Sequence, residues 1–194
     1  MQAEFISSHS TGRRDIFLLV ILALSLALNV LPGWKVQSMS NHIEARRNKV
    51  IEGLTISAIA AVGIDGEEKT IACAAGDQPT VLYIFSPTCV WCDRNLDNVR
   101  ALKGKIEQSH KFIGISLSSA GLNDYMNSHQ LDFPIYKQPS QEAIKQLGLG
   151  STPQTIVISP QGKVLKNWVG AYGSSKPEVE AYFGLKLPGV AESQ

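Results

Sequence analysis

Two cysteines separated by two residues form the part of this sequence best suited to chemistry. The motif Cys89-Val90-Trp91-Cys92 follows an apolar run, Thr80–Phe85, and precedes a segment with helical periodicity. Cysteines at this spacing across the first turn of a helix approach closely enough to form a disulfide, with a sulfur–sulfur bond of about 2.05 Å. The helix dipole and unpaired backbone N–H groups also stabilise a thiolate at a helix N-terminus. The motif therefore predicts a redox-active pair.

The positions of the two cysteines predict different roles. Cys89 lies nearer the start of the helix, and we expect it to be the exposed nucleophile that attacks a disulfide. Cys92 lies within the first turn, and we expect it to be the resolving thiol, so that Cys89 and Cys92 form the redox-active disulfide. The alternatives are a structural bridge, disfavoured because so short a loop removes little entropy, and half of a zinc site. Zinc needs two more ligands, and Cys73, His110 and His129 show no paired spacing, so we predict neither a metal nor a cofactor.

The composition excludes several classes of protein. The 194 residues have a formal net charge of +1, without the basic excess typical of nucleic-acid-binding proteins, and we expect no nucleic-acid partner. A hydrophobic content of 44% excludes fibrous and wholly disordered chains. Three cysteines are too few for a disulfide scaffold. The third, Cys73, is expected to be a small buried apolar side chain, with a third redox thiol as the alternative.

The segments around the motif predict an α/β domain over residues 53–188. Short apolar runs alternate with helical patterns, and Asp65-Gly66 is typical of a hairpin turn. Ser175-Lys176-Pro177-Glu178 is a capping box that predicts the start of the last helix. The expected strands are Leu54–Ile64, Lys69–Ala75, Thr80–Phe85, Phe112–Leu117, Thr155–Ser159 and Lys163–Val169. The expected helices are Cys92–Ile106, Leu122–His129, a turn or two around Ala143–Leu147, and one that ends at Phe183.

The apolar run from Ile16 to Leu31 predicts a membrane anchor over residues 16–34. At about 1.5 Å per residue this run spans about 24 Å, near the thickness of a bilayer core. Because no small-x-small site follows it directly, we favour an uncleaved anchor over a cleaved signal peptide. Arg13 and Arg14 abut the run and favour a cytoplasmic N-terminus. We therefore expect a cytoplasmic tail (1–15), the anchor (16–34) in contact with the lipid bilayer, a stalk (35–52), the domain (53–188) and a short tail (189–194).

The order of strand, Cys-x-x-Cys and helix, followed by Ser151-Thr152-Pro153 before a hairpin and a terminal helix, resembles the thioredoxin fold. The N-terminal hairpin, the insertion after Phe112–Leu117 and the anchor are similar to TlpA/ResA-type membrane-tethered thiol–disulfide oxidoreductases. The resemblance covers nearly all of residues 53–188. It implies a central mixed sheet flanked by helices, with a β-hairpin extension. It also implies that Pro153 is a cis-proline facing the cysteines and that Thr152 offers backbone groups to a substrate chain, whereas Trp91 either caps the site or contacts a partner.

The resemblance implies disulfide exchange with exported, cysteine-containing proteins, and an upstream redox partner that regenerates the dithiol. It favours reduction, for instance of an apocytochrome, by a single-pass inner-membrane protein with a periplasmic domain. Tyr83 occupies the place of the buried carboxylate of thioredoxin, six residues before Cys89, and a phenol with an ordinary pKa near 10 is a poor proton acceptor at neutral pH. The direction of electron flow therefore stays open. Peroxide reduction and copper delivery are alternatives, but residues 82–88 lack the peroxiredoxin motif, and no histidine follows His129.

Overall fold

The computed structural model describes residue 12 and residues 14–22, 24–25, 51–74 and 76–190. The chain forms two units, residues 1–43 and residues 44–194. In the first unit, residues 14–22 and 24–25 are helical, and their large apolar side chains are exposed. No helix among the described residues is long and apolar enough to cross a membrane. The expected anchor is described only at residues 16–22 and 24–25, and the rest of it, like most of the expected stalk, lies outside the described residues.

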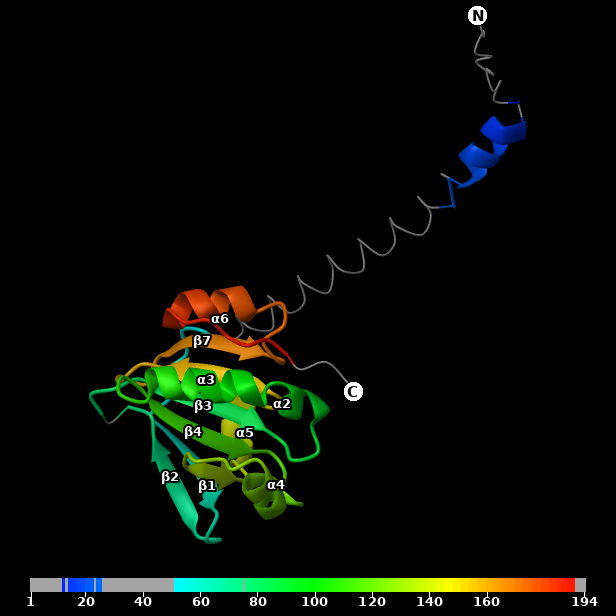
Figure 1. Ribbon diagram of the computed structural model, residues 1–194. Coiled ribbons are helices and arrows are strands. Elements are labelled where there is room, and N and C mark those ends of the chain that lie inside the picture. Colours follow the sequence, from blue (N-terminus) through cyan, green and yellow to red (C-terminus); the bar gives the residue numbers. More distant parts are fainter. Residues whose placement is uncertain (1–11, 13, 23, 26–50, 75, 191–194) are drawn as a thin grey trace, which may run out of the picture. The chain divides into compact units, whose positions relative to one another are not determined.

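A seven-stranded mixed sheet organises the second unit, with the strand order β2-β1-β5-β4-β3-β6-β7 (Figure 1). The central strand β3 runs parallel to β4 and antiparallel to β6, and β4 runs parallel to β5. The β1–β2 hairpin joins the sheet through the antiparallel pairing of β1 with β5. The strands are β1 (Ala58–Gly63), β2 (Glu68–Ala72), β3 (Thr80–Phe85), β4 (Lys111–Ser116), β5 (Ile135–Lys137), β6 (Gln154–Ile158) and β7 (Val164–Val169).

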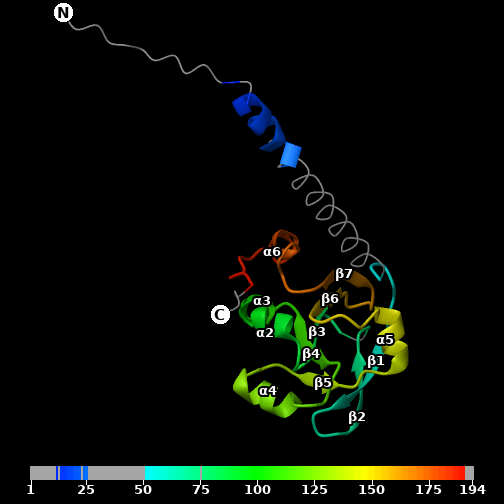
Figure 2. The same cartoon turned by 90° about the vertical axis from the view of Figure 1, so that its right-hand side faces the viewer.

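Helices cover both faces of this sheet. One face carries α2 (Val90–Arg94), α3 (Leu96–Ile106), α4 (Leu122–Ser128) and α6 (Lys176–Phe183), and the other carries α5 (Gln141–Leu147). Figure 2 shows α5 on the opposite side of the sheet from α2 and α3. The thioredoxin-like fold expected from the sequence, a mixed sheet flanked by helices, is therefore confirmed.

Two buried cores lie against the two faces, and β3 contributes to both. All six residues of β3 are buried, as expected for a strand covered on both faces. Because side chains alternate along a strand, Tyr83 belongs to one core and Leu82 to the other. The α3-side core also contains Val81, Phe85, Cys92, Val99, Leu102, Trp168, Tyr172 and Val179. The α5-side core also contains Ile59, Ile71, Cys73, Ile84, Ile115, Ala143, Leu147, Ile156 and Ile158.

The structure differs from the sequence-based expectations in several elements. The single helix expected over Cys92–Ile106 is divided at Asn95 into α2 and α3, and α2 begins at Val90. The strand β5 was not expected, because three residues are too few to show alternation. The first strand begins at Ala58 rather than Leu54, because residues 53–56 form only single backbone bonds to residues 162–164 and an isolated bridge. The expected capping box is wrong in one respect: the Ser175 side chain makes no capping hydrogen bond, and its backbone already has a helical conformation.

Candidate active site

Cys89 is the residue from which α2 begins. After β3 ends at Phe85, the Cys89 N–H donates to the Ser86 carbonyl at 3.1 Å and closes the turn into the helix. The Cys89 sulfur then accepts a hydrogen bond from the Cys92 N–H at 3.3 Å, in the way that an N-cap side chain satisfies a free backbone donor. Both side chains are free thiols in this structure. The two cysteines singled out in the sequence therefore lie across the first turn of one helix.

The segment before β6 lies directly against Cys89. The Thr152–Pro153 peptide bond is cis, and the Cys89 thiol donates to the Thr152 carbonyl with a sulfur–oxygen distance of 3.3 Å. The antiparallel register of β3 with β6 pairs Ile84 with Gln154, so the end of β3 and the start of β6 are adjacent. This register brings together two parts of the site that are more than sixty residues apart in the sequence.

The two thiols of the pair have different environments. Cys89 is partly buried, whereas Cys92 is completely buried in the α3-side core. Burial, together with the neighbouring Cys89 thiol, raises the pKa of Cys92 far above its ordinary range. A thiol attacks a disulfide only as the thiolate, so burial and the raised pKa both disfavour Cys92 as the first nucleophile.

Cys73 belongs to a different part of the molecule. Its side chain is 3% exposed in the α5-side core, and the thiol donates to the Ile71 carbonyl at 3.6 Å. Burial raises the pKa of Cys73 to about 11. The sheet separates this thiol from Cys89 and Cys92, so Cys73 is a buried apolar residue, as the sequence indicated.

The surface next to Cys89 is apolar and hollowed. Val90 and Trp91 are 60% and 54% exposed, and the Arg94 guanidinium lies 4.9 Å from the centre of the Trp91 ring. A pocket of about 390 Å³ separates Trp91 and Thr152 from the segment after β7. Its other lining residues are Val169, Gly170, Ala171, Gly173, Ser174 and Val190. Thr152, expected to offer backbone groups to a substrate chain, and Trp91, expected to cap the site or contact a partner, thus line one pocket.

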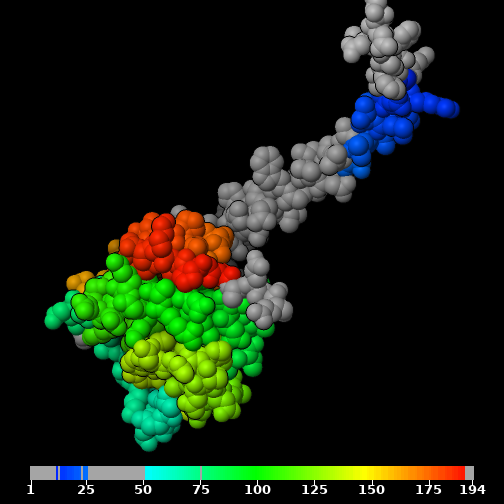
Figure 3. All heavy atoms as spheres, viewed as in Figure 1, coloured from blue at the N-terminus to red at the C-terminus, as the bar shows by residue number. Residues whose placement is uncertain are grey.

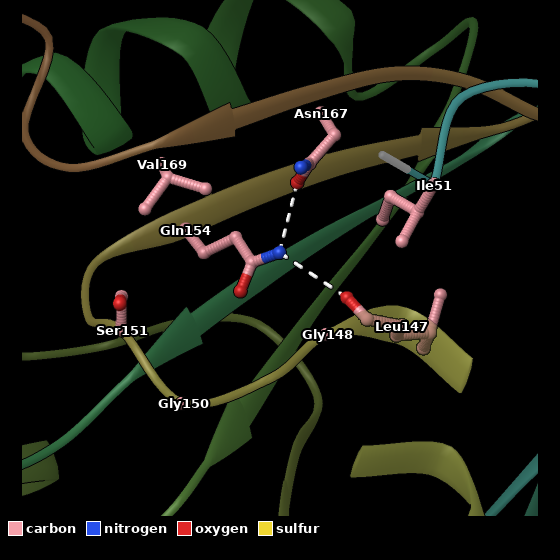
Figure 4. Close-up of a pocket in the computed structure, with 8 residues that line it drawn as sticks. All are labelled: Ile51, Leu147, Gly148, Gly150, Ser151, Gln154, Asn167 and Val169. Atoms are coloured by element: carbon pink, nitrogen blue, oxygen red, sulfur yellow. Dashed lines mark hydrogen bonds between the residues drawn. The ribbon is translucent and has the colours of Figure 1, made fainter. Parts of the chain in front are cut away.

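A second pocket, of about 330 Å³, is lined by the end of α5 and by Ser151 and Gln154, which lie on either side of Thr152 and Pro153 in the sequence (Figure 4). The Gln154 side chain donates from Nε2 to the Leu147 carbonyl at 3.4 Å and to Asn167 Oδ1 at 2.8 Å. These bonds tie the end of α5 and the strand β7 to the first residue of β6. The residues between Leu147 and Gln154 are therefore held at both ends, which fixes the Thr152 carbonyl beside Cys89.

Sequence analysis did not identify two buried asparagines next to Cys92. Asn95 and Asn98 are both fully buried at the start of α3, and Asn95 Oδ1 accepts from the Tyr172 N–H at 3.0 Å. Asn98 Oδ1 accepts from the Gly189 N–H at 2.8 Å, and Figure 3 shows the segment after α6 lying against α3. The sequence did contain a signal for these residues. Two asparagines lie three residues apart on the apolar face of the helix, and because an unpaired amide is rarely buried, this spacing indicates hydrogen-bonded side chains in the core.

Within the described ranges, no group of three or more His, Cys, Asp or Glu side chains is arranged to hold a metal ion. In the same ranges, the ionisable side chains that are buried belong only to cysteine and tyrosine. The chemistry that this site can perform with its own side chains is therefore thiol chemistry at Cys89 and Cys92.

Comparisons with known proteins agree with this geometry. The AhpC/TSA family matches residues 54–167, more than half of the chain. The structure is similar to StoA from Bacillus subtilis, with 18% identity and a TM-score of 0.52 over 68% of this chain and 98% of that one. It is also similar to a putative thiol:disulfide interchange protein DsbE from Chlorobium tepidum, with 17% identity and a TM-score of 0.57 over 67% and 93% of the two chains.

A third similar structure is a putative protein disulfide isomerase from Bacteroides thetaiotaomicron, with 16% identity and a TM-score of 0.57 over 71% of this chain and 90% of that one. No match was found among curated protein sequences. At these identities the structural likeness establishes the fold. Together with the family match, it confirms the resemblance to TlpA/ResA-type thioredoxin-fold proteins.

Proposed function

The chain belongs to the AhpC/TSA family, and we propose that it is a thiol–disulfide oxidoreductase that exchanges disulfides with cysteine-containing proteins through Cys89 and Cys92. The observation that supports this proposal best is the placement of the two thiols. The Cys89 sulfur lies at the start of α2 within hydrogen-bonding distance of the Thr152 carbonyl, and Cys92 is buried one turn further along. The names of the similar structures, an interchange protein and a disulfide isomerase, support the same reaction.

The reaction proceeds in two exchanges. The Cys89 thiolate attacks a substrate disulfide, forms a mixed disulfide and releases one substrate sulfur as a thiolate, which takes up a proton. Cys92 then loses its proton and attacks Cys89, so that the bond between Cys89 and the substrate breaks and the second substrate sulfur leaves. Two electrons pass from the dithiol to the substrate, and Cys89 and Cys92 end as a disulfide. An upstream dithiol donor must then reduce this disulfide.

The substrate chain binds across Trp91 and Thr152 in this proposal. Trp91 offers an exposed aromatic surface beside the pocket, and the Thr152 backbone lies next to the attacking sulfur. A polypeptide with its cysteine above Cys89 would place the neighbouring side chain over this pocket. We propose that the substrates are exported proteins and that the protein acts on them as a reductant.

Trapping of mixed disulfides tests the assigned roles. In the full-length chain, Cys92→Ser is expected to accumulate a mixed disulfide with a disulfide-bonded substrate, because the resolving thiol is gone, whereas Cys89→Ser traps none. Cys73→Ser is the matched control, since the buried Cys73 thiol lies in the other core and its loss leaves exchange unchanged. Equal trapping by the Cys89 and Cys92 variants would contradict the roles. Turnover of peroxide without disulfide exchange would replace the proposal with peroxide reduction.

A redox titration of the full-length chain decides the direction of electron flow. Dithiol proteins that act as reductants have reduction potentials of about −270 mV, whereas strong oxidants have potentials of about −120 mV. We expect a value at the reducing end of this range. A potential near the oxidising end would contradict the reductant assignment and leave the exchange reaction itself intact.

We also propose that residues 16–34 anchor the protein in the inner membrane with the α/β domain on the periplasmic side. The support is the apolar run from Ile16 to Leu31 and the two arginines that precede it. A membrane-impermeant maleimide should label Cys89 in intact spheroplasts, in which the periplasmic face is open to the reagent. Labelling that requires lysis would place the domain on the cytoplasmic side. Recovery of the chain in the soluble fraction after cell disruption would contradict the anchor.

A further inference from the structure

Backbone donors fix how the two buried asparagines after Cys92 are oriented. The Gly189 N–H donates to Asn98 Oδ1, and the Tyr172 N–H donates to Asn95 Oδ1. Because a backbone N–H can only donate, the accepting atom of each amide must be its oxygen. Asn98 Nδ2 in turn donates to Asn95 Oδ1 at 3.0 Å. Both N–H groups of Asn95 are therefore left for some other acceptor.

Asn95 Nδ2 and the Tyr83 hydroxyl are buried polar atoms without a hydrogen-bond partner among the described residues. Tyr83 is 1% exposed and Asn95 is fully buried. Burial raises the pKa of the Tyr83 phenol well above its ordinary value, and the Asn95 amide acts in the opposite sense, as a donor facing the phenol oxygen does. Buried polar groups are nearly always hydrogen-bonded. Two unpaired groups that face each other therefore indicate a third group that accepts a hydrogen bond from them.

Tyr83 lies on the face of β3 that α2 covers. The strand register places Tyr83 beside Thr155, and Thr155 beside Trp168, in one row across the sheet. The Thr155 hydroxyl is already bonded to the Tyr172 hydroxyl at 2.6 Å, so Tyr83 has the unpaired hydroxyl of this row. Tyr83 and Cys92 belong to the same buried core, and the phenol and the thiol interact electrostatically.

Disulfide exchange requires a negative charge on Cys92 in both directions. In reduction, Cys92 gives its proton to the departing substrate thiolate or to water and then attacks the Cys89 sulfur. In the reverse reaction, a substrate thiolate attacks Cys89 and Cys92 leaves as the thiolate. Burial opposes this charge, because a buried thiolate without a donor is strongly destabilised.

The groups that face the Tyr83–Cys92 region carry no positive charge. They are the Cys89 side chain, the phenols of Tyr125 from α4 and Tyr172 from the segment after β7, and two donors that lower the pKa of Cys92, the Ser86 N–H and the Thr152 hydroxyl. Burial raises the pKa of both phenols, and the half-exposed Asp93 carboxylate raises that of Tyr125 further. A thiolate at Cys92 therefore depends on hydrogen-bond donors rather than on a positive charge.

We propose that, when the Cys92 thiolate forms during exchange, the Tyr83 hydroxyl donates a hydrogen bond to it and Asn95 positions the phenol by donating to its oxygen, two hydrogen bonds that the dithiol protein does not make. This inference rests on the proposed disulfide exchange. The donors then run in one direction from Gly189 through Asn98, Asn95 and Tyr83 to the Cys92 sulfur. A neutral hydroxyl stabilises the thiolate when it forms and needs no partner while Cys92 is protonated.

The test is Tyr83→Phe in the full-length chain, which removes only the hydroxyl oxygen. Resolution of the mixed disulfide is expected to slow about 10- to 100-fold, the usual effect of a hydrogen bond to a charged group, while the initial attack by Cys89 is unchanged. In a Cys89→Ser background that also carries Cys73→Ser, so that Cys92 is the remaining thiol, the pKa of Cys92 is expected to rise by about 1 to 2 units, measured as a fall of about 10- to 100-fold in its alkylation rate at a fixed pH. Asn95→Ala is expected to shift this pKa less, and to shift it no further in combination with Tyr83→Phe.

The stability of the Tyr83→Phe variant separates this role from a structural one. Since the hydroxyl has no partner in the dithiol protein, its removal is expected to leave the free energy of unfolding unchanged or to increase it. Tyr136→Phe, at a partly buried tyrosine packed against the α5-side core, is the matched control and should change neither the rate nor the pKa.

Three outcomes would overturn the inference: an unchanged resolution rate, an unchanged Cys92 pKa, or a stability loss typical of a broken hydrogen bond. If the unaltered chain exchanges no disulfides, the proposed function fails instead. The Cys92 pKa in the Cys89→Ser background still decides the role of Tyr83 in that case, because this measurement needs no substrate.

Discussion

Removing one partner of the hydrogen bond between Thr155 and Tyr172 is expected to destabilise the domain more than removing both. The two hydroxyls lie 2.6 Å apart, both residues are 1% exposed, and Tyr172 belongs to the α3-side core. Tyr172→Phe leaves the Thr155 hydroxyl buried without this partner, and Thr155→Val leaves the phenol in the same condition. The double variant leaves neither group, and it keeps the shape of both side chains.

The expected magnitudes follow from the cost of a buried unpaired hydroxyl. Each single variant is expected to lower the free energy of unfolding by about 2 kcal/mol, whereas the double variant lowers it by about 1 kcal/mol or less. The two changes are then coupled by about 3 kcal/mol, far more than the few tenths seen for independent sites. Tyr172 also fixes the segment after β7 that lines the pocket beside Trp91, so the single variants should weaken substrate binding more than the double variant does.

Urea unfolding of the reduced full-length chain measures these values, and the fluorescence of the buried Trp168 reports on the core that contains the bond. Tyr182→Phe, at a partly exposed tyrosine of α6, is the matched control and should change stability by less than about 0.5 kcal/mol. Additive losses in the double variant would show that the two hydroxyls do not depend on each other, and would refute the reasoning.

Two other properties of single residues can be tested by unfolding. Because burial raises the pKa of Cys73 from 9.0 to about 11, its contribution to stability is present below pH 9 and is lost as the pH rises towards 11. Under reducing conditions, the free energy of unfolding of Cys73→Ala should therefore fall by about 3 kcal/mol less over this pH range than that of the unaltered chain. An identical fall in both proteins would contradict the pKa shift. Gly162→Ala is expected to cost at least about 2 kcal/mol more than Gly66→Ala in urea unfolding. Both glycines have positive φ (82° and 89°), but a Cβ at Gly162 would collide with the Ile56 carbonyl, whereas Gly66 is open; equal losses would contradict this contact.

Local patterns in the sequence were sufficient to predict most elements of the fold. The continuous apolar run of β3, the turn at Asp65-Gly66 and the spacing of apolar residues in α3 each depend on interactions between near neighbours. The structure has strands or helices at these places. Cys89 and Cys92 were also identifiable, because the N-cap position and the buried first turn both follow from a strand that leads into a helix.

Contacts between distant residues explain what the sequence did not reveal. The strand β5 is short, and only its pairing with β1 and β4 makes it a strand. The orientation of the Asn95 amide depends on Tyr172, 77 residues away, and that of Asn98 depends on Gly189, 91 residues away. No local pattern contains such partners. At Ser175, the helical backbone keeps the side chain from capping, although the residue types match a capping box.

The two outer strands of the sheet offer little opportunity for another chain to add a strand. On one side, the outer strand β2 exposes Glu68 and Lys69, and charged side chains on a short outer strand discourage pairing with a second sheet. On the other side, the Val164 N–H donates to the Leu54 carbonyl and the Asn167 N–H donates to the Glu52 carboxylate, so the segment before β1 occupies backbone groups at these two positions of β7. The folded domain is thereby protected against edge-to-edge aggregation at high concentration.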